Sequence, residues 1–309
     1  MKTAMIASFA AILLPALAGC QPAKTGGEEA DTGSIPKIEG YTLLWSDEFN
    51  GTDLNTKVWN IEVNGNGGGN NELQYYTDRK SNVSMGTDPE SGEKCLILTA
   101  IKESYSGRSC TSGRVNTKNK MAFKHGLVEA RMKIPRTTNG LWPAFWMMGN
   151  DYDRVGWPAC GEIDIMEMGS AEGIKNNTQE RYFSGWMHWG PSYNGGAYPN
   201  YGQYRTNSYA IQGSYHTFRL YWDENQIRMY LDQNLYPTVE PYCTMDIPAS
   251  DADAAPGKYF HKPFFILFNL AVGGNFTGTG NINDITALNA ENGYKANFYI
   301  DYVRVYQKE

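Results

Sequence analysis

Residues 216–231 read HTFRLYWDENQIRMYL, and this stretch is the clearest indication of the fold in the chain. Two runs of strand-forming residues, 216–222 and 226–231, flank the polar turn Asp223-Glu224-Asn225. Two such runs joined by a short turn predict a β-hairpin. The centre of the second half of the chain is therefore expected to be antiparallel sheet.

Three further segments predict strands on either side of this hairpin. Residues 127–134 (LVEARMKI) alternate partly, and residues 296–306 (ANFYIDYVRVY) alternate again near the C-terminus. Residues 263–272 (PFFILFNLAV) are almost continuously apolar, as in a strand that is buried on both faces. Only residues 282–292 suggest a short helix. Many strands separated by Gly, Asn and Pro turns predict an all-β fold, a β-jelly roll sandwich, and residues 41–309 show no second linker or internal repeat.

The composition limits the classes of function. The 309 residues include 41% apolar and 19% charged residues, which excludes wholesale disorder. There are 27 Lys and Arg against 33 Asp and Glu, and no basic cluster, so the chain has no electrostatic surface for nucleic acid. Eight Trp, 21 Tyr and 33 Gly favour a turn-rich β protein with aromatic stacking surfaces.

The N-terminus has the pattern of an export signal. Lys2 precedes an apolar run over residues 4–18, which is too short to span a membrane but has the length of a secretory segment. The run ends in Leu17-Ala18-Gly19-Cys20, which resembles the lipobox of bacterial lipoproteins. We therefore expect a signal peptide over 1–19, a lipid on Cys20, a flexible polar tether over 20–40, and an exported, membrane-anchored protein. An ordinary signal peptide is the alternative.

The other cysteines leave two questions open. An exported protein permits disulfides, but Cys95, Cys110, Cys160 and Cys243 allow three connectivities and the sequence does not choose among them. The chain has no CxxC or HxxxH pattern, so the cysteines and histidines do not indicate a metal site.

The segment with the strongest chemical signal is Gly161–Met168 (GEIDIMEM). On a regular strand, Glu162 and Asp164 lie on one face while the isoleucines pack behind them. Glu167 is out of phase by one residue, and leaving it in the apolar layer would bury an unpaired charge. A β-bulge near Met166 would return Glu167 to the carboxylate face, so we predict one there.

This spacing suits the hydrolysis of glycosides. With the bulge, Glu162 and Glu167 are roughly 13 Å apart along the strand, and inclined side chains would bring their carboxyls to about 5 Å. That separation is typical of retaining glycosidases, in which one carboxylate attacks the sugar and the other donates and accepts the proton. Asp164 between them would tune the charge of Glu162. A solvated acidic face and a calcium site are the alternatives, but Trp142, Trp146 and Trp157 close by in sequence favour a sugar site.

A series of motifs in this chain resembles glycoside hydrolase family 16, in particular its laminarinase-like members. The central one is Glu-x-Asp-x-x-Glu over residues 162–167. The others occur in family order and cover nearly everything after Tyr41: WSDEFNG (45–51), NNELQYYT (70–77), SGR (112–114), HGLVEARMKIP (125–135), LWPAFWMMG (141–149), VGWPACGEIDIMEMG (155–169), LFNLAVGGNF (267–276) and YIDYVRVYQ (299–307).

The resemblance implies a jelly roll with an open concave cleft and endo-acting, retaining cleavage of a β-linked polysaccharide. It implies that Glu162 is the nucleophile, Glu167 the general acid/base and Asp164 its helper. The same resemblance, with the tryptophans already noted, gives the candidate substrate-binding residues: Trp146 beneath the sugar at the scissile bond, Trp142, Asn71 and Arg114 on the non-reducing side, His188 near the cleavage point, and Trp157.

The resemblance also bears on metals and on specificity. Asp301 sits where some relatives hold a structural calcium, with backbone oxygens near Glu48 completing the site; Asp301 could equally be an ordinary strand-edge residue. No cofactor is expected for the reaction. Residues 183–213, rich in Tyr, Gly and Asn, depart from the pattern, and we expect them to be a loop that forms part of the cleft wall and affects specificity.

The leading hypothesis is a monomeric endo-1,3(4)-β-glucanase acting on laminarin or mixed-linkage β-glucan. The first alternative is an endo-β-galactosidase acting on N-acetyllactosamine-type glycans, with the same acid/base groups and different subsites. The second is a glycan-binding jelly roll without activity, although such a protein would not need three carboxyl groups at 162, 164 and 167.

Overall fold

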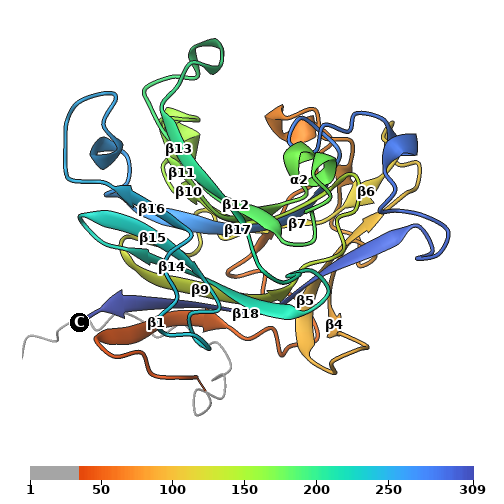
Figure 1. Ribbon diagram of the computed structural model, residues 1–309, viewed down its shortest axis with the longest axis horizontal. Helices are drawn as coiled ribbons and strands as arrows, with labels where there is room; N and C mark the ends of the chain where they lie inside the picture. Colours follow the sequence, from red (N-terminus) through yellow and green to blue (C-terminus); the bar gives the residue numbers. More distant parts are fainter. Residues whose placement is uncertain (1–34) are drawn as a thin grey trace, which may run out of the picture. The chain divides into compact units, whose positions relative to one another are not determined.

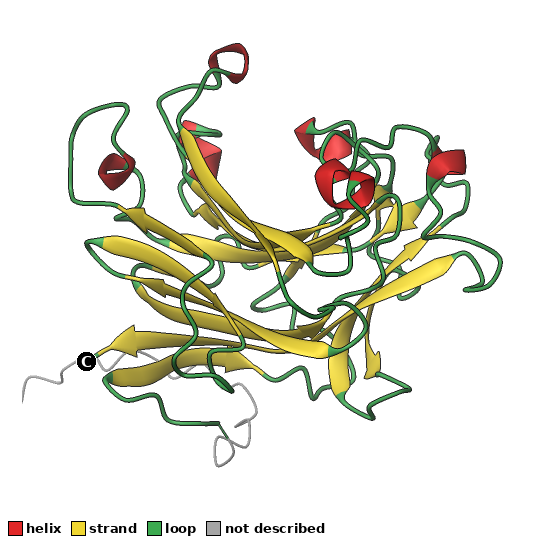
Figure 2. Ribbon diagram, in the orientation of Figure 1, coloured by secondary structure: helices red, strands yellow, loops and turns green. Residues whose placement is uncertain are grey.

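Residues 35–309 are the part of the chain that this computed structural model describes, and they contain eighteen strands in two sheets (Figures 1 and 2). The predicted signal peptide, Cys20 and most of the tether lie outside the described residues. The compact unit begins at Lys37. None of the helices within 35–309 has the length and apolarity needed to cross a membrane.

The ten-stranded sheet has the strand order β16-β15-β14-β9-β18-β5-β6-β3, with β1 paired to β18 and β4 to β5. Its strands are β1 (Tyr41–Asp47), β3 (Tyr75–Tyr76), β4 (Val83–Thr87), β5 (Lys94–Ile101), β6 (Thr111–Ser112), β9 (Gly126–Lys133), β14 (Tyr215–Trp222), β15 (Gln226–Leu231), β16 (Cys243–Asp246) and β18 (Lys295–Lys308).

The eight-stranded sheet lies above it in Figure 1 and has the order β13-β12-β11-β10-β17-β7-β2, with β8 paired to β17. Its strands are β2 (Asn60–Ile61), β7 (Arg114–Asn116), β8 (Ala122–Phe123), β10 (Leu141–Gly149), β11 (Glu162–Met168), β12 (Tyr182–His188), β13 (Asn200–Thr206) and β17 (Phe264–Val272). All neighbouring strands in the two sheets are antiparallel except β3 and β6.

The helices are short and lie in connecting segments (Figure 2). They are α1 (Tyr152–Val155), α2 (Ala171–Lys175) and the 3₁₀ turns η2 (Gly67–Gly69), η3 (Asn194–Gly196), η4 (Pro256–Lys258) and η5 (Ile282–Asp284). The all-β sandwich predicted from the sequence is confirmed.

The strand predictions are confirmed and two loop-region predictions are wrong. The hairpin forms between β14 and β15, with Trp222 paired to Ile227. The predicted helix over 282–292 is only the turn η5, because Asn281, Asn289 and Asn292 accept nearby backbone N–H groups and so compete with helical hydrogen bonds. Residues 183–213 are not one loop, since β12 covers residues 183–188 and β13 residues 200–206 of this segment, although the segment does line the cleft as expected.

The apolar core fills the space between the two sheets. Every residue of β17 is buried, as its continuous apolar sequence predicts. Phe264, Ile266, Phe268 and Leu270 pack into the core between the sheets, while Phe265 and Leu267 join a second apolar cluster on the opposite face of the sheet. A strand apolar on both faces thus lies near the centre of the eight-stranded sheet, beside β10, which pairs with the carboxylate strand β11.

The predicted bulge is present in β11. Glu167 pairs with Ala144 on β10 and Asp164 with Trp146, so the two intervening residues of β11 oppose only Phe145. The same register shift occurs against β12. Ile165 and Met166 are consequently both buried in the core between the sheets, and Glu167 returns to the face that carries Asp164.

Two neighbours accommodate the bulge. Tyr242 donates a hydrogen bond from its hydroxyl to the backbone carbonyl of Ile165. Without this bond, the irregular strand pairing at the bulge would leave that carbonyl buried and without a partner. Gly185 on β12 lies opposite the bulge, and a Cβ there would come within 2.4 Å of Met229 Sδ. The bulge therefore depends on the Tyr242 hydroxyl and on a glycine at position 185.

The four cysteines of the described residues are free and buried. Burial raises the pKa of the Cys95 thiol to about 11 and that of Cys110, Cys160 and Cys243 to about 12. None of the three disulfide connectivities that the sequence left open is formed in the structure.

Replacing Tyr242 with Phe tests whether its hydroxyl supports the bulge. The Ile165 carbonyl would lose its partner in a buried environment, so we expect a loss of about 1–3 kcal/mol in the free energy of unfolding, measured by denaturant titration. Tyr236→Phe, at an exposed position, is the control and should change little. Equal stability of Y242F and the wild type would show that the hydroxyl does not support the bulge.

Candidate active site

A cleft of about 1430 Å³ runs over the face of the eight-stranded sheet that is turned away from the core. Strands β7, β10, β11, β12, β13 and β17 all contribute side chains to it, as do the segments around 66–72, 193–198 and 275–276. The cleft is larger than the 300–1,000 Å³ of an ordinary small-molecule site. Its size and its extent across several strands suit an extended chain of sugars.

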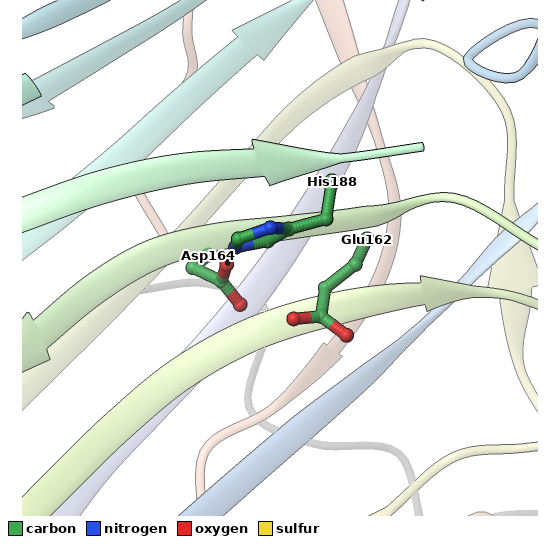
Figure 3. Close-up of side chains that lie close together, drawn as sticks. All are labelled: Glu162, Asp164 and His188. Atoms are coloured by element: carbon green, nitrogen blue, oxygen red, sulfur yellow. Dashed lines mark ion pairs between the residues drawn. The ribbon is translucent and has the colours of Figure 1, made fainter. Parts of the chain in front are cut away.

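The three predicted carboxyl groups line the middle of this cleft. Glu162, Asp164 and Glu167 all lie on its floor, and Asp164 and Glu167 are less than a tenth exposed. His188 approaches them from the neighbouring strand β12, with its Nε2 atom 3.3 Å from Asp164 Oδ2 (Figure 3). One ligand atom each of Glu162, Asp164 and His188 lie within 4.8 Å of one another, and these are the described residues that could hold a metal ion.

Burial and crowding keep protons on these carboxyl groups. Burial, and then the charge of Asp164, raise the pKa of Glu162 to about 8, while His188 and Arg114 oppose this rise. Burial, and then the charges of Asp164 and Glu162, raise the pKa of Glu167 well above its usual value. Burial also raises the pKa of Asp164. His188 also opposes the rise at Glu167, whereas Arg114 opposes it at Glu162, so Arg114 favours Glu162 as the group that ionises.

Glu167 is held by Trp142. The indole Nε1 of Trp142 donates to Glu167 Oε1 at 3.0 Å, and its ring stacks on Phe276 at a centroid distance of 4.6 Å. The position of the second glutamate is therefore fixed by a tryptophan from the adjacent strand β10. Trp142 was predicted to bind substrate, and it lines the cleft while also contacting the acid/base candidate.

Trp146 lies on the cleft floor, and two polar side chains hold it in place. Its Nε1 donates to Asn269 Oδ1 at 2.7 Å. The guanidinium of Arg114 lies 4.8 Å from its ring centre, and Arg114 in turn pairs with Glu62 at 3.0 Å. This arrangement leaves the other ring face of Trp146 for a sugar, since the apolar C–H face of a hexose packs well on an aromatic ring.

Two other predicted binding residues line the cleft and one does not. Trp157 lies near His188, with 6.2 Å between ring centres, and both face the cleft. His188 Nδ1 is buried without a protein partner, so it can bond to a sugar hydroxyl. Asn71 is exposed and bonds to Asn275, and its neighbour Asn70 lines the cleft instead.

The residues predicted for calcium are paired with arginines. Asp301 bonds to Arg131, and Glu48 bonds to Arg304 at 2.7 and 3.0 Å. Both carboxylates thus already have a cation partner, and the calcium site stays a prediction.

Several cleft residues were not recognised from the sequence. They are Glu62, Asn116, Trp186, Tyr193, Tyr198, Tyr204, Asn269 and Phe276. Trp186 had a signal that could have identified it, because it alternates with Ser184 and His188 along residues 182–188. Tyr193, Tyr198 and Tyr204 belong to the segment 183–213, which was expected as a whole to form part of the cleft wall. Asn269 lies within the buried strand β17, whose apolar sequence gave no indication of a cleft residue. The position of the others is defined only by the folded chain.

Comparisons with known proteins show the family of this chain. Residues 43–308 match the family described as "Beta-porphyranase A-D, GH16 domain". The chain is 35% identical to glucan endo-1,3-beta-glucosidase A1 of Niallia circulans over 90% of this chain and 39% of that longer protein. It is 31% identical to a beta-glucanase of Rhodothermus marinus over 99% of this chain and 97% of that protein.

A solved structure is also similar. It is a Bacteroides ovatus mixed-linkage glucan GH16 protein in complex with a G4G4G3G product, with 42% identity and a TM-score of 0.73 over 85% of this chain and 100% of that chain. The fold and the carboxylate site together define a retaining glycoside hydrolase. The chain belongs to glycoside hydrolase family 16.

Glu162→Gln tests whether folding raises the pKa of Glu162. The pKa of Glu162 rises from 4.5 to about 8 on folding, so the folded state binds the proton more tightly than the unfolded state. Its destabilising effect is absent below pH 4.5 and grows as the pH rises toward 8. We expect E162Q to melt about 5 °C above the wild type at pH 8 and at nearly the same temperature at pH 4.

Thermal unfolding at the two pH values measures this difference. Glu172→Gln, an exposed glutamate in α2, is the control and should not show it. A wild-type protein more stable than E162Q at pH 8 would contradict the assignment of a raised pKa.

Proposed function

We propose that this protein is a retaining, endo-acting β-glucanase that cleaves β-1,3 or mixed β-1,3/1,4 linkages. The observation that carries the proposal is the set of three carboxyl groups that the β11 bulge gathers on the floor of a long aromatic cleft. The similarity to proteins named as glucanases supports glucan as the polymer.

In the first step, the ionised Glu162 carboxylate attacks the anomeric carbon of the sugar that lies over Trp146. The bond from that carbon to the glycosidic oxygen breaks, and Glu167 gives its proton to the departing oxygen. Arg114 favours the ionised form of Glu162, whereas burial and then the charges of Asp164 and Glu162 raise the pKa of Glu167, so the electrostatics are consistent with these roles.

In the second step, water attacks the same carbon of the glycosyl ester. Glu167, now ionised, takes a proton from the water, and Glu162 leaves as a carboxylate. Asp164 lies between the two and contacts His188, so a proton on Asp164 can follow the changing charge of Glu162.

The mechanism predicts the effect of removing either carboxyl group. Glu162→Gln and Glu167→Gln should each lower kcat on the preferred polysaccharide by at least about 10³-fold, because each removes a group required in the transition state. Binding of oligosaccharide, measured by titration calorimetry, should survive within a few fold. Glu172→Gln should retain full activity. Substantial turnover by either variant would refute the roles given to these residues.

Cleavage of a galactan is the competing proposal, because the family model that matches the chain is named after β-porphyranases. Both activities would use the same carboxyl groups, so a substrate panel is the test. We expect products from laminarin or barley β-glucan, analysed by size, and none from agarose, porphyran or keratan-type glycans. Short oligosaccharides of several lengths would show endo action, whereas release of single sugars only would contradict it. Cleavage of only the galactans would overturn the glucanase proposal.

We also propose that the protein is anchored to a membrane through a lipid on Cys20. The support is the Leu17-Ala18-Gly19-Cys20 sequence after a short apolar run, followed by a polar tether. Expression in a bacterial host with radiolabelled palmitate should label the wild type and place it in the membrane fraction. Cys20→Ala should lose both the label and the membrane association. Release of an unlabelled wild-type protein would support an ordinary signal peptide instead.

A further inference from the structure

Trp186 lies flat against its neighbouring strand. It is half-buried on the cleft face of β12 and pairs with Gly202 on β13. A Cβ at position 202 would lie only 2.1–2.6 Å from three atoms of the indole. No side chain other than hydrogen therefore fits at 202 while the ring is in this position, and one indole face covers the glycine while the opposite face is turned to the cleft.

Tyrosines border this ring. Tyr204, the next cleft-facing residue of β13, meets Trp186 edge to face, with 5.6 Å between ring centres and 74° between planes. Tyr204 itself stacks on Tyr182 at 5.0 Å and 6°. Tyr204 is 43% exposed although it lines the cleft. The three rings form a floor and a side wall of the cleft. None of the roles described so far for the site accounts for them.

The strand order places these rings on the opposite side of the carboxyl groups from Trp146 and Arg114. Strand β11 lies between β10 and β12, so Trp146 and Arg114 are on one side of the carboxylates and Trp186 and Tyr204 on the other. An endo-acting enzyme binds sugars on both sides of the bond that it cuts, and Trp146 with Arg114 accounts for only one of them.

The strand order assigns the leaving group to one side. Trp146 on β10 and Arg114 on β7 lie on the side given to the sugars that stay bound to the nucleophile, so the departing sugar is assigned to the side of β12 and β13. Tyr204 pairs with Ser184, and Ser184 pairs with Glu167, so Tyr204 lies in one row with the proton donor, with a small residue between them.

We propose that Trp186, lying on Gly202 and bordered by Tyr204, is the stacking platform for the β-linked hexosyl residues on the leaving-group side of the scissile bond. The platform rests on the proposed function, because it assumes cleavage of a β-linked chain in this cleft. A glucosyl ring with equatorial hydroxyls has an apolar C–H face that can stack on the indole of Trp186. Trp146 would bind a sugar in the same way on the other side of the scissile bond. Gly202 is then a specificity residue, since it alone permits the flat ring.

The test compares two substrates that share the donor sugars and differ in the leaving group. Laminarihexaose places glucosyl residues on both sides, whereas β-laminaritriosyl fluoride releases only fluoride and leaves the platform empty. We expect Trp186→Ala to lower kcat/KM on the hexaose about tenfold, the effect of losing one sugar–aromatic stack. On the fluoride, kcat/KM should stay within twofold of the wild type.

Two further variants separate binding from folding. Gly202→Ala leaves the tryptophan in the chain but displaces its ring, and it should reproduce the selective loss on the hexaose. Trp186→Tyr retains an aromatic face and should recover most of the activity. Tyr201→Ala is the matched control, because Tyr201 is an exposed residue of the same strand that does not line the cleft.

The outcomes distinguish the platform from the proposed function. If the wild type cleaves both substrates and W186A and G202A slow both equally, Trp186 has a structural role and the platform is refuted. Unchanged activity of W186A on the hexaose refutes it as well. If the wild type cleaves neither these substrates nor any β-glucan, the glucanase proposal fails and the platform fails with it.

Discussion

The β11 bulge is the constraint on which the rest of the site depends. A strand alternates its side chains, so two glutamates five residues apart cannot share a face without an extra residue between them. The chain places Ile165 and Met166 together in the core and so turns Glu167 toward the cleft. The support comes from the opposite face of the sheet, where Tyr242 binds the Ile165 carbonyl and Gly185 leaves space. The core between the sheets therefore determines how Glu162 and Glu167, the proposed catalytic pair, are placed.

The same arrangement has an electrostatic cost. Burial raises the pKa of all three carboxyl groups, and the charge of Asp164 raises that of both glutamates further. His188 lowers the pKa of both glutamates, whereas Arg114 lowers that of Glu162. In the proposed mechanism, this asymmetry gives two chemically identical side chains the different roles of nucleophile and acid. Trp142 and Trp146 each have two contacts in the site. Each indole N–H donates to a polar side chain of the cleft floor, and each ring also lines the cleft.

Much of this could be predicted from the sequence because the pattern of a strand determines which face each residue takes. The hairpin at 216–231, the doubly buried β17 and the bulge all follow from local alternation. Other parts could not be predicted, for different reasons. Alternation with His188 places Trp186 on the cleft face, but its flat position depends on Gly202, which pairs with it only in the folded sheet. The helix over 282–292 is prevented by asparagine side chains that bond to the nearby backbone. Asn71 bonds to Asn275, a cleft residue remote in sequence, and its role in binding stays a prediction.

The four buried thiols have a practical consequence. Between 35 and 309, the two sheets are held by apolar packing and hydrogen-bonded ladders without any covalent cross-link. A thiol with a pKa near 11 or 12 is almost entirely protonated at neutral pH and is a poor nucleophile. Folding of residues 35–309 therefore requires no oxidant or disulfide isomerase, and this part of the chain suits production in a reducing cytoplasm.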